Sequence, residues 1–317
     1  MKAPAFWHSN TIVSAMLAPF AKAYAAASAC HLRHIKPVRA RVPVICVGNV
    51  TLGGAGKTPV ALAIGQMLRD RGLNAFYLSR GYGGERTEPL LVNPLIHTAA
   101  EVGDEPLLLA RVLPTVVATR RPDGAKLAAA YGAEMLIMDD GLQNPYLHKD
   151  LSLLVIDGTY GFGNGRVVPA GPLREPAEAA MARADAVIIV NPSEKTPAVK
   201  EGIPVLHART VPDSMIEDFK GKTVVAFCGI AQPEKFFSLL EAHGVTLAQR
   251  KAFADHHPYS RAEIESLLGL GLPLVTTAKD KVRIPADLQQ QITTVEISLE
   301  FEDKSAIDLL LQKLSPS

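Results

Sequence analysis

A glycine-rich segment, VGNVTLGGAGKTP, occupies residues 47–59 and separates an apolar run from a stretch with helical periodicity. Closely spaced glycines let successive backbone N–H groups converge on phosphate oxygens at the positive end of a helix. The usual pattern, G-x-x-x-x-G-K-[ST], begins with glycine, but this chain has Thr51 there, a small hydroxyl residue that can also make the turn. We therefore predict a nucleotide-binding loop formed by Thr51, Gly53, Gly54, Ala55, Gly56, Lys57 and Thr58.

Two residues after the glycines carry the chemistry expected of such a loop. Lys57 is expected to reach the β- and γ-phosphates of the nucleotide, and Thr58 to hold Mg²⁺. Pro59 follows near the first helical turn, where a missing N–H costs little. The loop alone therefore predicts a bound nucleotide, without saying what receives a phosphate.

Apolar strand-like runs alternate with helix-like stretches along most of the chain. Strands that are apolar throughout, when joined by helices, indicate a parallel sheet covered on both faces. The predicted strands cover residues 42–48, 75–79, 89–92, 115–119, 135–140, 151–157, 186–191 and 204–209, with helices over 57–72, 103–113 and 123–132 between them. The predicted fold class is α/β: a P-loop NTPase-like, mostly parallel sheet covered by helices.

A polar stretch at 210–222 predicts a domain junction, and the α/β pattern resumes after it on a smaller scale. We expect an N-terminal amphipathic helix over residues 1–40, a P-loop domain over 41–212, and a second, smaller α/β domain over 213–317.

The leader is apolar and basic, and no Asp or Glu precedes Asp70. Such a leader favours an anionic membrane surface. Pro19 and Lys22 break its apolar runs into lengths too short to span a bilayer. A helix packed on its own domain explains the pattern equally well. The residues that would form one face of an interfacial helix are Phe6, Trp7, Ile12, Met16, Leu17 and Phe20.

Composition excludes some classes of protein. The formal net charge of +1 indicates neither a nucleic-acid binder nor an acidic, solvating chain. Three widely spaced cysteines form no disulfide framework and no C-x-x-C metal pattern, which fits a reducing, cytoplasmic setting.

Charged groups follow several of the predicted strands. Asp139 and Asp140 end the run MLIMDD, at the strand end where a P-loop fold places the acid that orders Mg²⁺. Arg80, Arg120 and Arg121 follow other strands in the same way, which indicates an anionic substrate at that edge of the sheet.

Two further motifs are less specific. Asp104 and Glu105 open a helix-like segment, and their spacing alone favours helix capping. His256 and His257 are adjacent and have no third metal ligand at a useful spacing. One histidine that serves acid–base chemistry or orients a carboxylate is the more economical interpretation.

These motifs together resemble one known family. GNVTLGGAGKTP, LSRGYGG, GDEP, DDGLQ, GFGNGRVVPAGPLRE, FADHH and TTAKD occur in the order found in the lipid A 4′-kinases (tetraacyldisaccharide 4′-kinases), and the resemblance runs from about Val44 to Asp280. That family has a small hydroxyl residue at the position of Thr51. The resemblance implies transfer of the ATP γ-phosphate to the 4′-hydroxyl of a tetraacylated, 1-phosphorylated glucosamine disaccharide, which gives lipid IVA.

The resemblance also implies roles for the residues of the nucleotide site. In GGAGKT, Lys57 and Thr58 take the nucleotide and Mg²⁺ roles, and in DDGLQ, Asp139 and Asp140 match the acids of the metal site. ATP and Mg²⁺ are the implied cofactors.

Acceptor chemistry is implied for a second group of residues. Asp104 in GDEP matches the catalytic carboxylate of the family, against the capping interpretation. His256 in FADHH matches the histidine that pairs with it, with His257 as the other candidate. Arg121 matches a catalytic arginine near the phosphates, although Arg120 beside it leaves the register open.

A lipid acceptor stays in its membrane, so the resemblance gives the leader a purpose. We expect peripheral docking through the N-terminal helix on the anionic, cytoplasmic face of the bacterial inner membrane, by a monomer with no nucleic-acid partner. The smaller domain would complete the active site by closing over the kinase domain.

Two functions from other classes remain as alternatives. A nucleotide-switch ATPase or GTPase often has the loop K-G-G-x-G-K-T, but this chain has Leu52 at the signature lysine. TTAKD faintly matches the guanine-reading N-K-x-D, with Thr277 where Asn is needed. A non-enzymatic lipid-binding module would leave Lys57 and the paired aspartates without a purpose.

Overall fold

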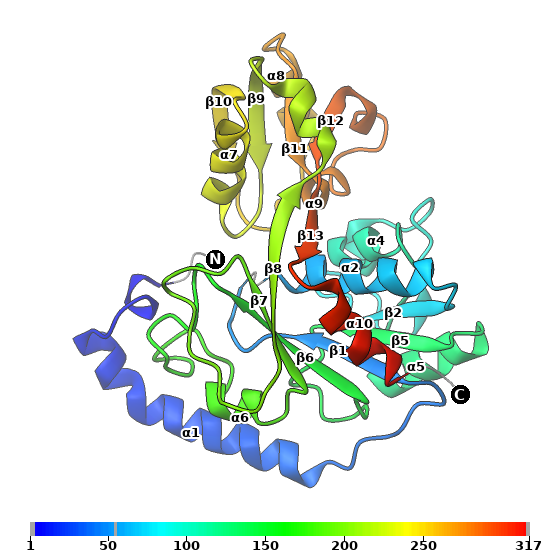
Figure 1. Cartoon of the computed structure of the whole chain (residues 1–317). Helices are drawn as coiled ribbons and strands as arrows, with labels where there is room; N and C mark the ends of the chain where they lie inside the picture. Colours follow the sequence, from blue (N-terminus) through cyan, green and yellow to red (C-terminus); the bar gives the residue numbers. More distant parts are fainter. Residues whose placement is uncertain (1–3, 54–55, 315–317) are drawn as a thin grey trace.

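The computed structural model describes residues 4–53 and 56–314, and within these ranges the strands form two sheets (Figure 1). The larger sheet has nine strands in the order β13-β8-β7-β6-β1-β5-β2-β4-β3, and the smaller has four in the order β10-β9-β11-β12. We call residues 214–295, built around the smaller sheet, the small-sheet unit, and the rest of the described chain the large-sheet unit.

The strands are β1 (Val44–Gly48), β2 (Ala75–Ser79), β3 (Leu90–Leu91), β4 (Thr115–Val117), β5 (Met135–Asp139), β6 (Leu151–Asp157), β7 (Ala186–Val190), β8 (Val205–Pro212), β9 (Thr223–Cys228), β10 (Thr246–Ala252), β11 (Leu274–Thr277), β12 (Ile292–Val295) and β13 (Ile297–Phe301). The helices are α1 (Ile12–His34), α2 (Lys57–Asp70), α3 (Ala99–Val102), α4 (Asp104–Leu109), α5 (Arg121–Ala130), α6 (Ala177–Met181), α7 (Pro233–Ala242), α8 (Arg261–Leu268), α9 (Ala278–Lys281) and α10 (Lys304–Gln312), with short 3-10 turns η1 (Ala5–Trp7), η2 (Ser214–Phe219) and η3 (Gln289–Gln291).

The centre of the larger sheet is parallel and buried on both faces. β1 pairs in parallel with β5 and β6, and every residue of these three strands is buried. Successive side chains of a strand point to opposite faces, so Ile45 packs in the cluster that includes α2, whereas Cys46 packs in the cluster that includes α5. Among the named strands of the described residues, the antiparallel pairings are those at the two edges, β3 with β4 and β13 with β8. The predicted α/β sheet covered by helices is confirmed.

The small-sheet unit repeats this arrangement with fewer strands. Its four strands pair in parallel, and α7 and α8 cover opposite faces. Val224 on β9 packs with the side chains of α7, and its neighbour Val225 packs with those of α8. A second, smaller α/β unit therefore follows the stretch that was predicted as a junction.

The end of the chain returns to the larger sheet. β13 pairs with β8 from Ile297 opposite Pro212, and Ile307 and Leu311 of α10 pack in the same cluster as α2. The predicted range 213–317 for the smaller domain differs from this arrangement, because these apolar side chains complete the core of the larger sheet. In Figure 1, β8 and β13 run together between the two units. The division at residues 1–40, 41–212 and 213–317 otherwise stays a prediction.

The N-terminal helix α1 is a single element of 23 residues that continues through Pro19. Thr11 caps it through a capping box with Ser14. The mean hydropathy of its most apolar 18-residue window is 1.3, and 11% of that window is buried, so length and composition alone would let this helix cross a membrane. Core helices and signal sequences also meet that criterion. Pro19 therefore does not interrupt the helix, and the expectation that Pro19 and Lys22 leave apolar runs too short to span a bilayer stays a prediction.

One face of α1 is exposed and apolar. Ile12, Met16 and Phe20, spaced four residues apart, are 80%, 70% and 67% exposed, and side chains at that spacing share one helix face. Leu17, predicted on this face, packs instead against the core of the larger sheet. The predicted residues Phe6 and Trp7 lie before the helix, in η1.

Candidate active site

The glycine-rich loop connects β1 to α2, as the sequence predicts. Gly56 has φ of 78°, a left-handed conformation that favours glycine, and it precedes the first residue of α2, Lys57. No described side chain caps this helix, so its first N–H groups are free to meet an anion. Gly53 also has a positive φ, of 108°. Gly54 and Ala55 lie outside the described residues.

Hydrogen bonds of Asn49, at the start of the glycine-rich loop, hold other residues of the loop in place. The Asn49 amide donates to the carbonyl and hydroxyl oxygens of the buried Thr51, at 2.9 and 3.1 Å. Lys57 Nζ donates to Asn49 Oδ1 at 3.2 Å and lies 3.6 Å from Asp140 Oδ1. Asn49 therefore orients both ends of the loop, a role that sequence reasoning missed although the residue belongs to the glycine-rich segment. Thr58 lines the same cleft as Lys57.

The two adjacent aspartates have opposite environments. Asp139 ends β5 beside Val47 of β1, and its buried Oδ1 has no hydrogen-bond partner among the described residues. Burial, reinforced by the charge of Glu105 and opposed by Lys57, raises the pKa of Asp139 to about 7.

Asp140 is tied to basic groups instead. Arg174 donates to both of its carboxylate oxygens, at 3.0 and 3.2 Å. Burial raises the pKa of Asp140, but Lys57 and Arg174 outweigh it and hold the pKa below its ordinary value. The motif GFGNGRVVPAGPLRE contains Arg174, so the signal was present in the sequence, but no role was predicted for this residue.

The donor set fits one magnesium ion. No group of three or more His, Cys, Asp or Glu side chains in residues 4–53 and 56–314 could enclose a metal ion. Mg²⁺ in phosphoryl-transfer sites needs only one or two carboxylates, because phosphate oxygens and water complete its shell. The unpartnered oxygen of Asp139 and the Thr58 hydroxyl suit this role, while both oxygens of Asp140 already accept from Arg174.

A second charged cluster joins the two units. Asp104, 3% exposed, begins α4, and its Oδ2 lies 3.0 Å from His256 Nδ1 of the small-sheet unit. Its Oδ1 accepts from the backbone N–H of Glu105 at 3.0 Å. Asp104 thus satisfies one backbone donor in its helix, but its other oxygen faces His256, 152 residues away. Lys279 donates to Glu105 at 2.9 Å beside this pair.

These contacts set the charges of the pair. The hydrogen bond from His256, with the charges of Lys279 and Arg283, overcomes burial and lowers the pKa of Asp104. The same hydrogen bond raises the pKa of His256. Because the ionised Asp104 carboxylate can only accept, His256 Nδ1–H donates. His257 pairs with Glu263 at 3.1 Å instead. Of the two histidines, the structure therefore brings His256 to Asp104.

The structure also distinguishes Arg121 from Arg120, because the two side chains lie in different environments. Arg121 is buried, donates to the Ala118 carbonyl at 2.8 Å, and leaves a buried Nε without a partner among the described residues. Burial lowers its pKa to about 10, against the charge of Asp139. Arg120 is 84% exposed and pairs with Asp123. Arg121 is therefore the arginine that shares the site with Asp139.

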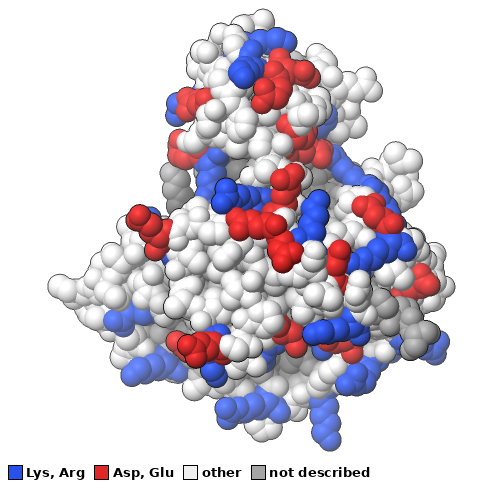
Figure 2. Space-filling model, viewed as in Figure 1, with Lys and Arg blue, Asp and Glu red and all other residues white. Residues whose placement is uncertain are grey.

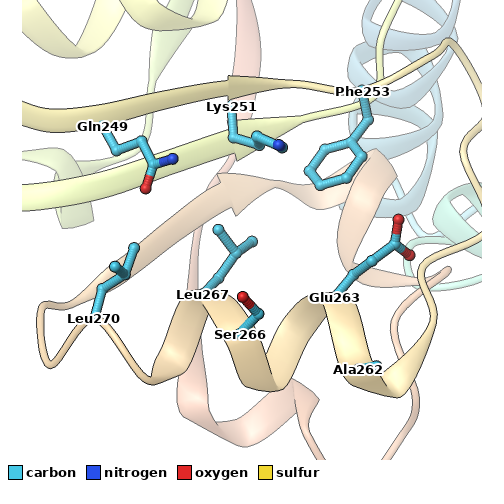
Figure 3. A pocket seen from close by; sticks show the side chains of 8 residues that line it. All are labelled: Gln249, Lys251, Phe253, Ala262, Glu263, Ser266, Leu267 and Leu270. Atoms are coloured by element: carbon cyan, nitrogen blue, oxygen red, sulfur yellow. The ribbon is translucent and has the colours of Figure 1, made fainter.

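One cleft of about 2820 Å³ lies between the two units and extends to the N-terminal segment. Its lining includes Lys57, Thr58, Arg121, Asp139, Asp140, Arg174 and His256. Figure 2 shows side chains of both charge signs gathered where the units meet. A separate cavity of about 420 Å³ lies between β10 and α8, lined by Lys251, Phe253 and Glu263 among others (Figure 3). It contains no residue that the sequence predicts for the site.

The loop between β1 and α2, the acid at the end of β5 and the parallel sheet that holds them define a P-loop nucleotide-binding enzyme. The model of the tetraacyldisaccharide-1-P 4′-kinase family, LpxK, matches residues 13–315, and the chain belongs to this family. The resemblance seen in the sequence is confirmed.

Relatives cover almost the whole chain. A tetraacyldisaccharide 4′-kinase of Rhodospirillum rubrum is 47% identical over 99% of this chain and 98% of its own length, and one of Rhodospirillum centenum is 49% identical over 99% and 97%. The crystal structure of "apo" form LpxK from Aquifex aeolicus in complex with ATP is 26% identical, with a TM-score of 0.79 over 96% of this chain and 100% of that one.

Proposed function

We propose that this chain is an ATP-dependent lipid kinase that transfers the γ-phosphate of ATP to the 4′-hydroxyl of tetraacyldisaccharide 1-phosphate, forming lipid IVA in lipid A biosynthesis. Family membership supports the reaction, and the ATP complex of the Aquifex aeolicus relative supports the nucleotide. One observation carries the proposal for this chain: His256, the hydrogen-bond partner of Asp104, lines the same cleft as Lys57 and Asp139.

The residues divide the work of phosphoryl transfer between donor and acceptor. The loop N–H groups and Lys57 hold the β- and γ-phosphates, and buried Arg121 adds positive charge near the transferred group. Asp139 and Thr58 would hold Mg²⁺, with Asp140 beside them, and the bound ion would neutralise phosphate charge.

The acceptor hydroxyl needs a group to take its proton. The Asp104 carboxylate, held by His256, takes the proton as the 4′-oxygen forms a bond to the γ-phosphorus. The bond from the γ-phosphorus to the β–γ bridging oxygen breaks, and ADP leaves. A lowered pKa keeps Asp104 ionised and ready to accept at neutral pH.

The leader would bring the enzyme to its lipid. The exposed face of Ile12, Met16 and Phe20 suits the acyl boundary of a membrane, and α1 ends with Arg33 in its last turn. Figure 2 shows basic side chains along the lower edge, where α1 and the segment after it lie in Figure 1. We infer peripheral docking of a monomer on the anionic, cytoplasmic face of the inner membrane.

Transfer of ³²P from labelled ATP to a monophosphorylated acyl-disaccharide in detergent micelles tests the reaction. We expect labelled bisphosphorylated lipid from the wild-type protein and none from Lys57→Ala. Labelled phosphate released only to water would contradict the proposal and favour a nucleotide switch.

A further inference from the structure

Arg283 is a buried arginine of the small-sheet unit, and it has no role in the reaction proposed above. Its side chain is 6% exposed, although it carries a full charge. A buried guanidinium is costly unless its donors are paired. Its donors are indeed occupied: Nε donates to the Lys279 carbonyl at 3.1 Å, and Nη2 donates to Asp280 Oδ1 at 2.9 Å.

The remaining bonds of Arg283 reach the backbone around His256. Nη1 donates to the carbonyls of Gly229 and His257, both at 3.3 Å, and Nη2 also donates to Gly229 at 3.2 Å. The backbone N–H of His256 donates to the same Gly229 carbonyl at 3.1 Å. The guanidinium therefore bridges the end of β9 to the loop that carries His256.

This loop needs support, because His256 has φ of 58°. A residue other than glycine in the left-handed region is strained and keeps that conformation only when its surroundings impose it. The loop also approaches Gly229 closely: a Cβ on that glycine would lie 2.7 Å from the Ala254 carbonyl oxygen. The hydrogen bonds of Arg283 hold the loop in this strained conformation, which it would otherwise leave.

Asp280 anchors the guanidinium in turn. This fully buried carboxylate accepts from the Gly229 N–H at 2.7 Å and the Tyr259 hydroxyl at 2.7 Å, besides Arg283. Thr277 caps the same short helix, α9. Residues of the TTAKD motif thus hold the arginine in one geometry.

The arginine also faces the large-sheet unit. Its Nε lies 3.7 Å from Asp104 Oδ2, the oxygen that faces His256. We propose that Arg283 is a positioning residue of the kinase reaction: its planar fork, fixed on the Gly229 and His257 carbonyls, holds His256 against Asp104. The inference rests on the proposed function, in which this pair serves the acceptor hydroxyl.

Lysine cannot replace this arginine, because one ammonium group does not reproduce a rigid fork that spans two carbonyls and a carboxylate. A misplacement of about 1 Å at a reacting group can lower a rate by about a hundredfold. We therefore expect Arg283→Lys and Arg283→Met to lower kcat by about ten- to a hundredfold. KM for ATP should stay within about twofold, since the phosphate loop belongs to the other unit. Arg261→Met, an exposed arginine of the same unit, is the matched control.

A double-mutant cycle separates positioning from a general loss of stability. If Arg283 acts through His256, Arg283→Met should change kcat less than about twofold when it is added to His256→Ala. An additive loss, or full turnover in Arg283→Lys, would overturn the proposal.

A readout without turnover keeps this inference separate from the proposed function. In the full chain labelled with ¹⁵N-histidine, the pKa of His256 should fall toward its ordinary value in Arg283→Lys, which keeps the charge but loses the fork. An unchanged His256 titration would overturn the positioning role even if the kinase reaction were confirmed. A fall in that pKa in a protein that phosphorylates no acceptor would contradict the proposed function alone.

Discussion

At the scale of single residues, three aspartates of the candidate site have different surroundings, and these surroundings give each carboxylate a different role. Asp139 and Asp140 are neighbours, yet a buried oxygen of Asp139 has no hydrogen-bond partner among residues 4–53 and 56–314, whereas Arg174 donates to both oxygens of Asp140. Asp104 differs from both, because its partner belongs to the other unit. Asp140 thus meets a guanidinium and Asp104 an imidazole, whereas Asp139 is the carboxylate that we propose for Mg²⁺.

Removing the Asp104 carboxylate should stop acceptor chemistry without harming the nucleotide site. We expect Asp104→Ala to lower kcat by about a hundred- to ten-thousandfold, the usual contribution of a general base. The dissociation constant of ATP, measured by fluorescence titration, should change little. Asp218→Ala, an exposed acid in η2, serves as the control. Unchanged turnover in Asp104→Ala would sink the assignment of this residue.

The ionisation of His256 should report its contact with Asp104. Because the carboxylate stabilises the imidazolium, the pKa of His256 is raised, and it should fall in Asp104→Asn, as measured by NMR titration. The contribution of His256 to stability is full below its unfolded pKa and is lost as pH rises through the raised value. The contribution of Asp104, whose pKa is lowered, is present above its unfolded pKa and is lost as pH falls through the lowered value. A His256 pKa indifferent to Asp104→Asn would mean that the pair does not form in solution.

Local sequence could not reveal this pair. Acids in the first turn of a helix usually stabilise that helix, so spacing alone favoured capping for Asp104, and only the family resemblance pointed to catalysis. The choices between His256 and His257 and between Arg120 and Arg121 needed side-chain directions, which depend on the fold. The nucleotide-binding role of Lys57 could be predicted from the sequence, because the glycines that define the phosphate loop directly precede this residue in the chain.

At the scale of elements, continuous apolar runs identified the central strands, since both faces of a parallel sheet are buried. The run over 75–79 agrees with β2 residue for residue. The strand β13 lies within the range 213–317 predicted for the smaller domain, yet it pairs with β8 of the larger sheet, because an apolar pattern does not show which strands pair. For α1, sequence indicated an apolar helix but not its unbroken length or which residues pack inward.

The exposed face of α1 should govern membrane binding. We expect Met16→Ser with Phe20→Ser to weaken binding to vesicles of phosphatidylethanolamine and phosphatidylglycerol by about tenfold or more, since each buried apolar side chain contributes roughly 1.5–3 kcal/mol. Cosedimentation measures the bound fraction. Leu309→Ser, which changes an exposed leucine of α10, should leave binding unaltered. Full retention by the double variant would show that another surface docks.

At the scale of the whole molecule, ion pairs tie the small-sheet unit to the larger one. Lys279 meets Glu105 at 2.9 Å, and Lys235 of α7 meets Asp157 at the end of β6 at 2.7 Å. These pairs flank the Asp104–His256 contact and favour the closed cleft. Their partial exposure limits each to about 0–1 kcal/mol, so the units can separate for substrate exchange.

Reversing one of these charges should favour an open form. We expect Lys235→Glu, which repels Asp157, to enlarge the radius of gyration measured by small-angle X-ray scattering and to raise KM for the lipid acceptor, with little change in KM for ATP. Lys220→Glu makes the same charge change next to Glu217 within the small-sheet unit and should leave both unchanged. Equal radii for the wild type and Lys235→Glu would show that this pair does not hold the units together.

The chain leaves the larger sheet at β8 and re-enters it at β13, and the Asp213 N–H donates to the Glu296 carbonyl at 2.9 Å. Everything between these two points is therefore an insertion into a β-hairpin. A two-residue turn from Pro212 to Ile297 would close that hairpin and leave the larger sheet with all nine strands. The unit that carries the proposed nucleotide site is thus a complete sheet, and the unit that we propose for the acceptor is inserted into one of its turns.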